Sequence, residues 1–188
     1  MAEQNQSERL LDLITKAQAG DGEAFEMLYH ECYEPILRFM IMRVPSGDDA
    51  EDLTQQVFIR FYRNLQNWED QGYSPLAYIF TVARSVVADY WRKHKNRPIE
   101  NSEEVLPLLE DNSIGPDRQV IDKETTRQVM RAISRLPDNY QTVISLRLIK
   151  GLTNPEIAKM IGKSEVATRK LYSRGIQKLQ IELKGEEL

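Results

Sequence analysis

Apolar residues recur three and four positions apart along most of the chain. Because one face of an α-helix repeats every 3.6 residues, this spacing predicts amphipathic helices. No segment alternates apolar and polar residues in the way that a half-buried strand does. The pattern therefore predicts an all-α fold, with apolar stripes in the first half over residues 10–14, 25–42, 53–61 and 76–90.

Residues that favour helix ends divide these stripes. Short polar side chains accept hydrogen bonds from the first turn of a helix, and proline fits its first position. Pro35 interrupts the second stripe and is expected to end or kink that helix, with residues 36–42 continuing beyond it. The expected helix starts are Asp21 for the second stripe, Asp48 or Asp49 for the third, and Ser74 followed by Pro75 for the fourth.

Residues 97–118 carry three prolines, one glycine and many acids, with no helical period. Such a composition is typical of a linker. A chain of 188 residues is long enough for two small helical domains. We therefore expect domains at residues 1–96 and 119–188, joined by a flexible, acidic linker.

The second half predicts a helix-turn-helix near the C-terminus. A helix to Leu136 and another from Asp138 to Lys150 come first. Thr153 and Glu156 then have the spacing of a capping box, in which each side chain bonds to the other's backbone. Gly162 is expected to close that short helix, and Ser164 to cap the next after a very short turn.

The last helix separates its side chains into two faces. At 100° per residue, one face carries Thr168, Leu171, Tyr172, Gly175 and Leu179, which suit packing on the preceding helices. The other side offers hydrogen-bond donors that could reach guanine edges and phosphates in a major groove. An ordinary solvated basic face is the alternative for any single one of these residues, which are Arg169, Lys170, Ser173 and Gln177, flanked by Arg174 and Lys178.

The charge of the chain is unevenly distributed. The net charge is −4, yet basic residues gather at 92–95 and again along the last helix. Phosphate binding needs local positive charge, so this pattern predicts a protein that binds DNA weakly alone and needs a partner. The single cysteine, Cys32, excludes an internal disulfide and is expected to be a buried filler.

No targeting signal or metal-ligand spacing is evident. The first residues lack the basic-then-apolar pattern of a signal peptide, and no apolar run is long enough to span a bilayer. We expect a cytoplasmic protein with no membrane insertion, no metal and no cofactor.

The second half resembles region four of bacterial sigma factors. The similarity rests on Leu136-Pro137, Gly151-Leu152-Thr153, Glu156-Ile157-Ala158 and Ser164, and on the apolar spacing between them. The family usually carries Gly-Thr-Val where this chain has residues 166–168. The resemblance implies that the last helix reads the upstream (−35) promoter element.

The first half resembles region two of the same family. Taken together, the two resemblances cover residues 20–96 and 120–182. The segment DAEDLTQQVFIRFYRNL is similar to the helix that docks on RNA polymerase. It implies a polymerase-binding surface formed by Asp52, Gln55, Gln56 and Arg60.

The segment SPLAYIFTVARSVVADYWRKHKN is similar to the part of region two that captures the melted (−10) strand. Aromatic rings and a positive groove suit single-stranded DNA. For Tyr78 and Tyr90 core packing is the favoured interpretation, whereas Trp68 stays open between the two. The resemblance implies strand contacts from Trp68, Tyr73, Arg84, Asp89, Arg92 and Lys93.

The resemblance as a whole is to sigma factors of the extracytoplasmic-function (ECF) type, which lack the extra regions of housekeeping members. It implies three partners: core RNA polymerase, promoter DNA and an anti-sigma protein. A self-sufficient DNA-binding regulator is the second hypothesis, although no receiver-like pattern of strands and helices precedes the helix-turn-helix. An enzyme is the third, without a catalytic set or a phosphate-binding glycine loop to support it.

Overall fold

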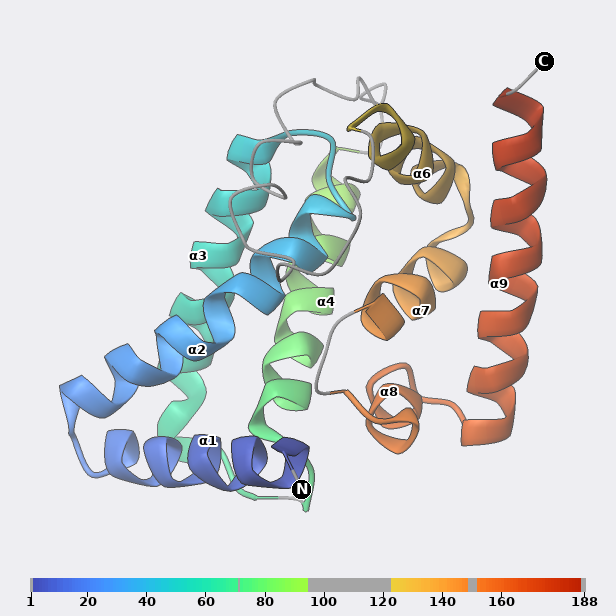
Figure 1. Ribbon diagram of the computed structural model, residues 1–188. Coiled ribbons are helices and arrows are strands. Elements are labelled where there is room, and N and C mark those ends of the chain that lie inside the picture. Colours follow the sequence, from blue (N-terminus) through green and yellow to red (C-terminus); the bar gives the residue numbers. More distant parts are fainter. Residues whose placement is uncertain (1, 71, 95–122, 149–151, 187–188) are drawn as a thin grey trace.

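The structure, a computed structural model, describes residues 2–70, 72–94, 123–148 and 152–186 (Figure 1). Within these ranges it is helical and has no strand, so the predicted all-α class is confirmed. The expected linker at 97–118 lies outside the described residues, as does Lys150, the expected end of the helix that starts at Asp138.

The first half is a bundle of four helices. Helices α2, α3 and α4 pack against one another, and α1 crosses one end of them (Figure 1). Their core is aromatic and aliphatic, with Phe39 meeting Phe80 edge to face at 5.6 Å. The helices are α1 (Ala2–Gln18), α2 (Gly22–Ile41), α3 (Gly47–Asn64), a 3-10 turn η1 (Leu65–Asn67) and α4 (Pro75–Lys93).

One expected helix boundary differs in the structure, and one of two alternatives is excluded. Of the two outcomes expected at Pro35, an end of the helix is excluded, because α2 continues through this residue to Ile41. The helix α3 begins at Gly47, because Ser46 has extended backbone angles and its hydroxyl accepts a hydrogen bond from the Asp49 N–H at 3.4 Å. Neither Asp48 nor Asp49 is therefore the cap. Asp21 does cap α2, as expected, by accepting from the Ala24 N–H.

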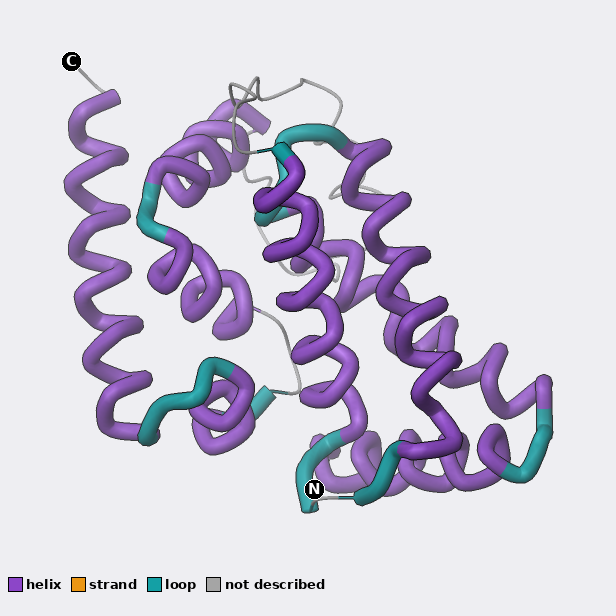
Figure 2. The backbone as a smooth tube through the Cα atoms, turned by 180° about the vertical axis from the view of Figure 1, so that it is seen from behind, coloured by secondary structure: helices purple, strands orange, loops and turns teal. Residues whose placement is uncertain are grey.

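The second half stacks on one side of α4. Helices α7 and α8 lie between α4 and α9, with α9 outermost, in both the front and the rear view (Figures 1 and 2). The long α9 packs along α6, α7 and α8. The helices are α6 (Lys123–Arg135), α7 (Asp138–Leu148), α8 (Asn154–Met160) and α9 (Glu165–Glu186).

The predicted helix-turn-helix signals are all confirmed. Thr153 and Glu156 form both bonds of the capping box. Gly162 follows α8 with a φ of +67° and ends it, and the Ser164 hydroxyl accepts from the Ala167 N–H at 3.2 Å to start α9. Three local features thus fix the angle at which α9 leaves α8.

Gly162→Ala is expected to lower the stability of this unit by about 1 kcal/mol, because an L-residue pays roughly 1–2 kcal/mol to adopt the left-handed conformation. Chemical denaturation measures the change. Gly185→Ala is the matched control: Gly185 is helical and nothing lies within 4 Å of the position of its Cβ, so alanine there should be neutral or stabilising. Equal stability of the Gly162→Ala variant and the unaltered protein would contradict the role assigned to the turn.

Gly175 marks the closest approach of α9 to α7. A Cβ built at this position would lie 3.2 Å from Cδ1 of Tyr140 and 3.3 Å from Cδ1 of Ile144. Glycine normally weakens a helix interior, but here its missing side chain lets the two helices approach closely. The helix α9 therefore packs closely against α7 at this point.

Candidate DNA and polymerase interfaces

The outer face of α9 presents the six polar side chains that the sequence singles out. Thr168, Gly175 and Leu179 are buried against the rest of the second half, whereas Leu171 and Tyr172 are half-buried there. The two predicted faces are thus confirmed as a packed face and a solvent face. The exposed set comprises Arg169, Lys170, Ser173, Arg174, Gln177 and Lys178.

One member of this basic set also serves packing. The Lys178 ammonium lies 5.9 Å from the centre of the Tyr140 ring, and the Arg147 guanidinium lies 5.3 Å from that of Tyr172. These contacts tie α9 to α7 at the flank. They leave Arg169 and Lys170 on the first exposed turns of α9, where a groove-reading helix makes its base contacts.

The predicted polymerase face of α3 is exposed in three of its four positions. Asp52, Gln55 and Gln56 are exposed. Arg60 instead pairs with Asp89 of α4, with 2.7 Å between Nη1 and Oδ2. Arg60 therefore holds α3 to α4 as well as bordering the exposed face.

Sequence reasoning missed two apolar side chains on α3. Ile59 is 50% exposed and Tyr62 is 59% exposed, although both are large. Both residues fall outside the apolar stripe of α3, and this is the sequence signal that could have identified them as exposed. The two side chains add exposed apolar area to the side of α3 that carries Asp52, Gln55 and Gln56.

Asp89 joins two of the predicted sites. It pairs with Arg60 of α3 and with Arg92, which lies one turn further along α4. The hydrogen bond from Arg60, followed by the charges of Arg60, Arg92 and Lys93, lowers the pKa of Asp89 below its ordinary value. The carboxylate thus stays charged and orients Arg92, while Lys93 is exposed beside it.

The aromatic residues of the loop before α4 flank a pocket of about 380 Å³. Trp68 is half-buried, and its carbonyl accepts a hydrogen bond from the Gln18 side chain at 2.8 Å. Its ring meets Tyr78 edge on, with 6.5 Å between the ring centres. Tyr73 lines the same pocket. Trp68 and Tyr73 therefore line one pocket, from the two ends of the loop before α4.

The remaining strand-reading candidates lie further along α4. Arg84 is half-buried, and burial lowers its pKa while the nearby Asp138 of α7 opposes that shift. Arg92 and Lys93 close the helix. Five of the six candidates therefore form two groups, one at each end of α4, whereas Arg84 lies midway along the helix, near Asp138 of the second half.

The three core interpretations made for single residues hold. Tyr90 is buried, and its hydroxyl donates to Asp49 at 2.8 Å. Tyr78 packs half-buried against the core. Cys32 is 1% exposed, and burial raises its pKa to about 12, so its thiol is inert packing.

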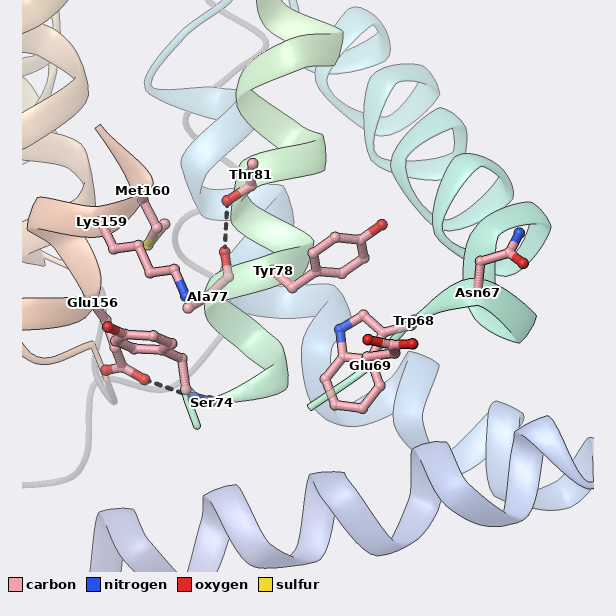
Figure 3. Close-up of a pocket in the computed structure, with 11 residues that line it drawn as sticks. Asn67, Trp68, Glu69, Ser74, Ala77, Tyr78, Thr81, Glu156, Lys159 and Met160 are labelled. Atoms are coloured by element: carbon pink, nitrogen blue, oxygen red, sulfur yellow. Dashed lines mark hydrogen bonds between the residues drawn. The ribbon is translucent and has the colours of Figure 1, made fainter. Parts of the chain in front are cut away.

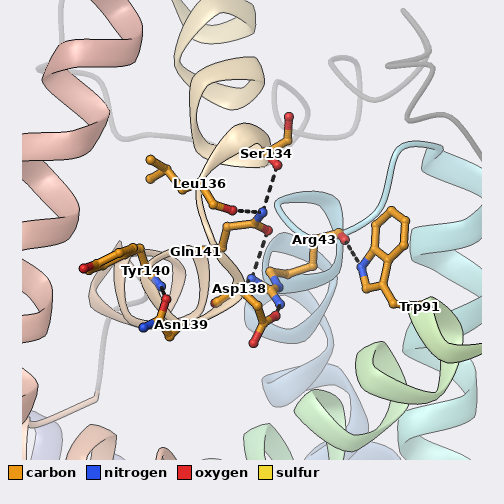
Figure 4. Close-up of polar contacts among 8 residues, drawn as sticks. All are labelled: Arg43, Trp91, Ser134, Leu136, Asp138, Asn139, Tyr140 and Gln141. Carbon is orange, nitrogen blue, oxygen red and sulfur yellow. Dashed lines mark hydrogen bonds and ion pairs between the residues drawn. The ribbon is translucent and has the colours of Figure 1, made fainter. Parts of the chain in front are cut away.

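A buried arginine joins the two halves of the chain, and sequence reasoning did not single it out. The Arg43 side chain is 3% exposed, and its guanidinium pairs with Asp138 and donates to the Gln141 side chain at 3.0 Å (Figure 4). The carbonyl of Arg43 accepts from the indole of Trp91 at 3.1 Å. Arg43 thus links the end of α2 to α4 and to the start of α7.

A second junction lies at the opposite end of α4. The Ser74 N–H donates to Oε1 of Glu156 at 2.9 Å (Figure 3), while Oε2 of the same carboxylate accepts the capping-box bond from the Thr153 N–H at 2.8 Å. Ser74 lies directly before Pro75, the first residue of α4, as predicted, but the Ser74 side chain makes no capping hydrogen bond. One turn along α8, the Lys159 ammonium lies 3.5 Å from the centre of the Tyr73 ring.

No helix in the described ranges combines the length and the apolar character needed to cross a membrane.

Two family models match the chain, each over one half. The model of sigma-70 region 2 matches residues 28–97, and that of sigma-70 region 4 matches residues 126–179. The first match contains α3, α4 and the loop between them. The second contains the helix-turn-helix.

Similar proteins and structures agree with these matches. BldN of Streptomyces coelicolor, an ECF RNA polymerase sigma factor, is 31% identical over 95% of this chain and 67% of its own length. The fold matches CnrH, solved with the cytosolic domain of CnrY, at a TM-score of 0.70 and 21% identity over 95% of this chain and 98% of that one. It also matches the sigma factor RpoE of Bartonella quintana, solved with the anti-sigma factor NepR, at a TM-score of 0.63 and 21% identity over 85% of this chain and 96% of that one. The chain therefore belongs to the sigma-70 family and is an RNA polymerase sigma factor of the ECF group.

Proposed function

We propose that three separate surfaces of this sigma factor carry out promoter recognition. The chain is a transcription initiation factor that directs core RNA polymerase to promoters, with region 4 serving the −35 element and region 2 the −10 element. The proposal assigns residues to these tasks. The observation that carries it is the outer face of α9, where donor side chains stand exposed opposite a packed face.

The −35 reader is the first part of that face. A helix in the major groove contacts base edges with its N-terminal residues and phosphates with its flanks. Arg169, Lys170 and Ser173 are assigned to bases. Arg174, Gln177 and Lys178 are assigned to the sugar-phosphate backbone.

The −10 reader is the loop before α4 together with the basic end of that helix. Stacking on aromatic rings and attraction to a positive groove hold single strands without demanding a rigid duplex. Trp68 and Tyr73 supply rings beside a pocket, and Arg92 and Lys93 supply charge. We assign Asp89 the role of orienting Arg92. We assign Arg84 to the melted strand, which it can contact when α7 is no longer next to it.

The polymerase-docking surface is the exposed side of α3. Asp52, Gln55 and Gln56 offer polar contacts, and Ile59 and Tyr62 add apolar area within the same exposed side. Arg60 borders the surface while paired with Asp89. Polar groups around a small apolar centre are typical of transient protein interfaces.

Asp52→Ala combined with Gln56→Ala is expected to weaken core-polymerase binding by roughly 1 kcal/mol or more for each side chain that lies at an interface hot spot. Both side chains are exposed, so the helix should persist. Titration of labelled protein with purified core polymerase measures the loss. The matched control is Glu8→Ala with Gln6→Ala, which removes one carboxylate and one amide from exposed positions of α1. Equal affinities of the two double variants would remove α3 from the interface.

Transcription from a promoter library with purified core polymerase tests the function as a whole. Promoter-specific initiation that depends on this protein is the expected result. A DNA-binding regulator without sigma activity would bind DNA yet would not support initiation by core polymerase alone.

Two further proposals concern partners and organisation. We infer an anti-sigma protein as a regulator, supported by the likeness to the RpoE fold that was solved with NepR. We place the protein in the cytoplasm, where RNA polymerase and the chromosome are found. We also propose domains at residues 1–96 and 119–188, because each of these ranges contains most of one matched region.

A further inference from the structure

The turn that leads into Trp68 is held by a side chain from another helix. Gln18, the last residue of α1, donates from its amide nitrogen Nε2 to the carbonyl of Leu65 and to the carbonyl of Trp68, at 2.8 Å in each case. The Trp68 N–H donates to the same Leu65 carbonyl at 3.1 Å. One amide group therefore bridges the first residue of η1 and the residue that follows its end.

The contact between α1 and η1 is reciprocal. The carbonyl of Gln18 is one of the last four of α1, which have no partner within their own helix. It accepts a hydrogen bond from Nε2 of Gln66, the middle residue of η1, at 3.0 Å. The three hydrogen bonds join segments that lie 47 or more positions apart in the sequence. They therefore fix the turn against the helical bundle and not only against itself.

The end of α1 that carries Gln18 is itself fixed by backbone hydrogen bonds. Gly20 has a φ of +95°, and its N–H donates to the carbonyl of Ala17 at 3.0 Å. The N–H of Asp21 donates to the carbonyl of Lys16 at 3.1 Å, and the Asp21 carboxylate caps α2. A glycine in the left-handed conformation with these two bonds is a common way to end a helix. Gln18 thus lies beside a well-defined corner between two helices.

The backbone that Gln18 supports is the one that orients the Trp68 ring. Trp68 has extended backbone angles, with φ of −76° and ψ of 131°, so the chain leaves the turn at this residue. The ring is half-buried, meets Tyr78 edge on and borders the pocket. A ring that is already fixed loses less conformational freedom on binding than a ring on a free loop, and this difference contributes to affinity.

We propose that Gln18 is a positioning residue for reading the −10 strand, because its amide fixes the backbone of Trp68 and so places the ring to stack on a base. The inference rests on the proposed role of Trp68. Every residue of α1 precedes residue 28, where the match to region 2 begins, so that match assigns α1 no part in promoter recognition. The polymerase-docking side of α3 and the outer face of α9 consist of other residues and should keep their affinities.

Gln18→Met tests the proposal, because methionine keeps the length and the helix propensity of glutamine but has no N–H donor. The probe is a promoter found with the initiation library, premelted over its −10 element and titrated with holoenzyme. Binding should weaken about fivefold, the effect of one or two lost hydrogen bonds between uncharged groups. The matched control is Gln6→Met, at an exposed position of the same helix, which should bind as the unaltered protein does.

Combining Gln18→Met with Trp68→Ala separates positioning from a general loss of stability. If Gln18 acts through the Trp68 ring, the double variant should bind the premelted promoter no more weakly than Trp68→Ala alone. Additive losses would mean that Gln18 acts by another route and would overturn the proposal. The affinities of Gln18→Met for core polymerase and for a −35 duplex should not change, and a drop in either would also overturn it.

Gln66→Ala provides a second variant, because Gln66 is exposed and its loss leaves the Gln18 amide in place. Binding of the premelted promoter should weaken about twofold, as expected for one exposed hydrogen bond. Fluorine NMR of protein labelled with 5-fluorotryptophan reports on the two tryptophans separately. Both variants should shift or broaden the Trp68 resonance and leave that of Trp91 unchanged. An unaltered Trp68 resonance in both would overturn the proposal.

The result for Trp68→Ala alone distinguishes this inference from the function on which it rests. Weaker binding of the premelted promoter by Trp68→Ala, with normal binding by Gln18→Met, keeps the strand-reading role of Trp68 and rejects positioning by Gln18. Normal binding by Trp68→Ala rejects both.

Discussion

Arg169→Ala is expected to cost about 1–3 kcal/mol at the cognate −35 element and to relax the preference at one or two base pairs. Arg169 lies in the second turn of α9, exposed, on the side opposite the buried Thr168 and Gly175. A guanidinium in the major groove donates two hydrogen bonds to one guanine, and its loss removes discrimination as well as affinity. Affinities for a set of single-base promoter variants measure both.

Arg174→Ala is the internal comparison for this prediction. Arg174 is also exposed on α9 but stands at the flank, where phosphates lie. Its loss should weaken all sequences about equally and lower the salt slope by about one. Both variants are measured at two salt concentrations. If Arg169→Ala also lost affinity equally for all promoter variants, Arg169 would be a phosphate contact and not a base contact. Residues 166–168, which depart from the usual family sequence, would then be the first place to look for a different depth of insertion.

Trp68→Ala should impair open-complex formation on duplex promoters by the equivalent of about 1–3 kcal/mol, the usual worth of one base stacked on an aromatic ring. Trp68 is half-buried beside the pocket and keeps part of its ring available. Permanganate footprinting of the melted strand measures the effect. A premelted template should not fully rescue the variant, because the lost contact is to the single strand itself.

Two variants separate stacking from local folding at this position. Trp68→Phe keeps a ring for stacking and should restore most of the melting. Arg92→Ala removes charge at the other end of α4 without touching the Trp68 carbonyl, which Gln18 holds. Normal melting in both Trp68→Ala and Arg92→Ala would exclude this surface from strand capture.

Local sequence signals predicted the helix-turn-helix well because each depends on residues three or four positions apart. Thr153 with Glu156, Gly162 and Ser164 all act within one turn of the residues that they stabilise. The start of α3 was less certain from sequence, because Ser46 lies two positions before Asp48 and caps helices as well as aspartate does. Propensity alone does not choose between such neighbours.

The junctions between the halves could not be predicted, because no local period encodes them. Glu156 shows in sequence as a capping-box residue, yet its second partner, Ser74, lies 82 positions earlier. In the sequence, Arg43 follows an apolar run and looks like an ordinary solvent-exposed residue at a helix end. In the structure it is buried and pairs with Asp138, 95 positions later. Pairs so distant are defined only when the helices pack.

The close approach of Gly175 to Tyr140 and Ile144 limits which positions of α9 can be varied when this protein is retargeted to new promoters. A combinatorial library at Arg169, Lys170, Ser173 and Gln177 would vary only solvent-facing positions and leave the scaffold intact. A library that included position 175 would mostly return clones whose reading helix had been pushed off α7. In such clones every base contact would shift together, and selection would recover loss of binding instead of altered preference.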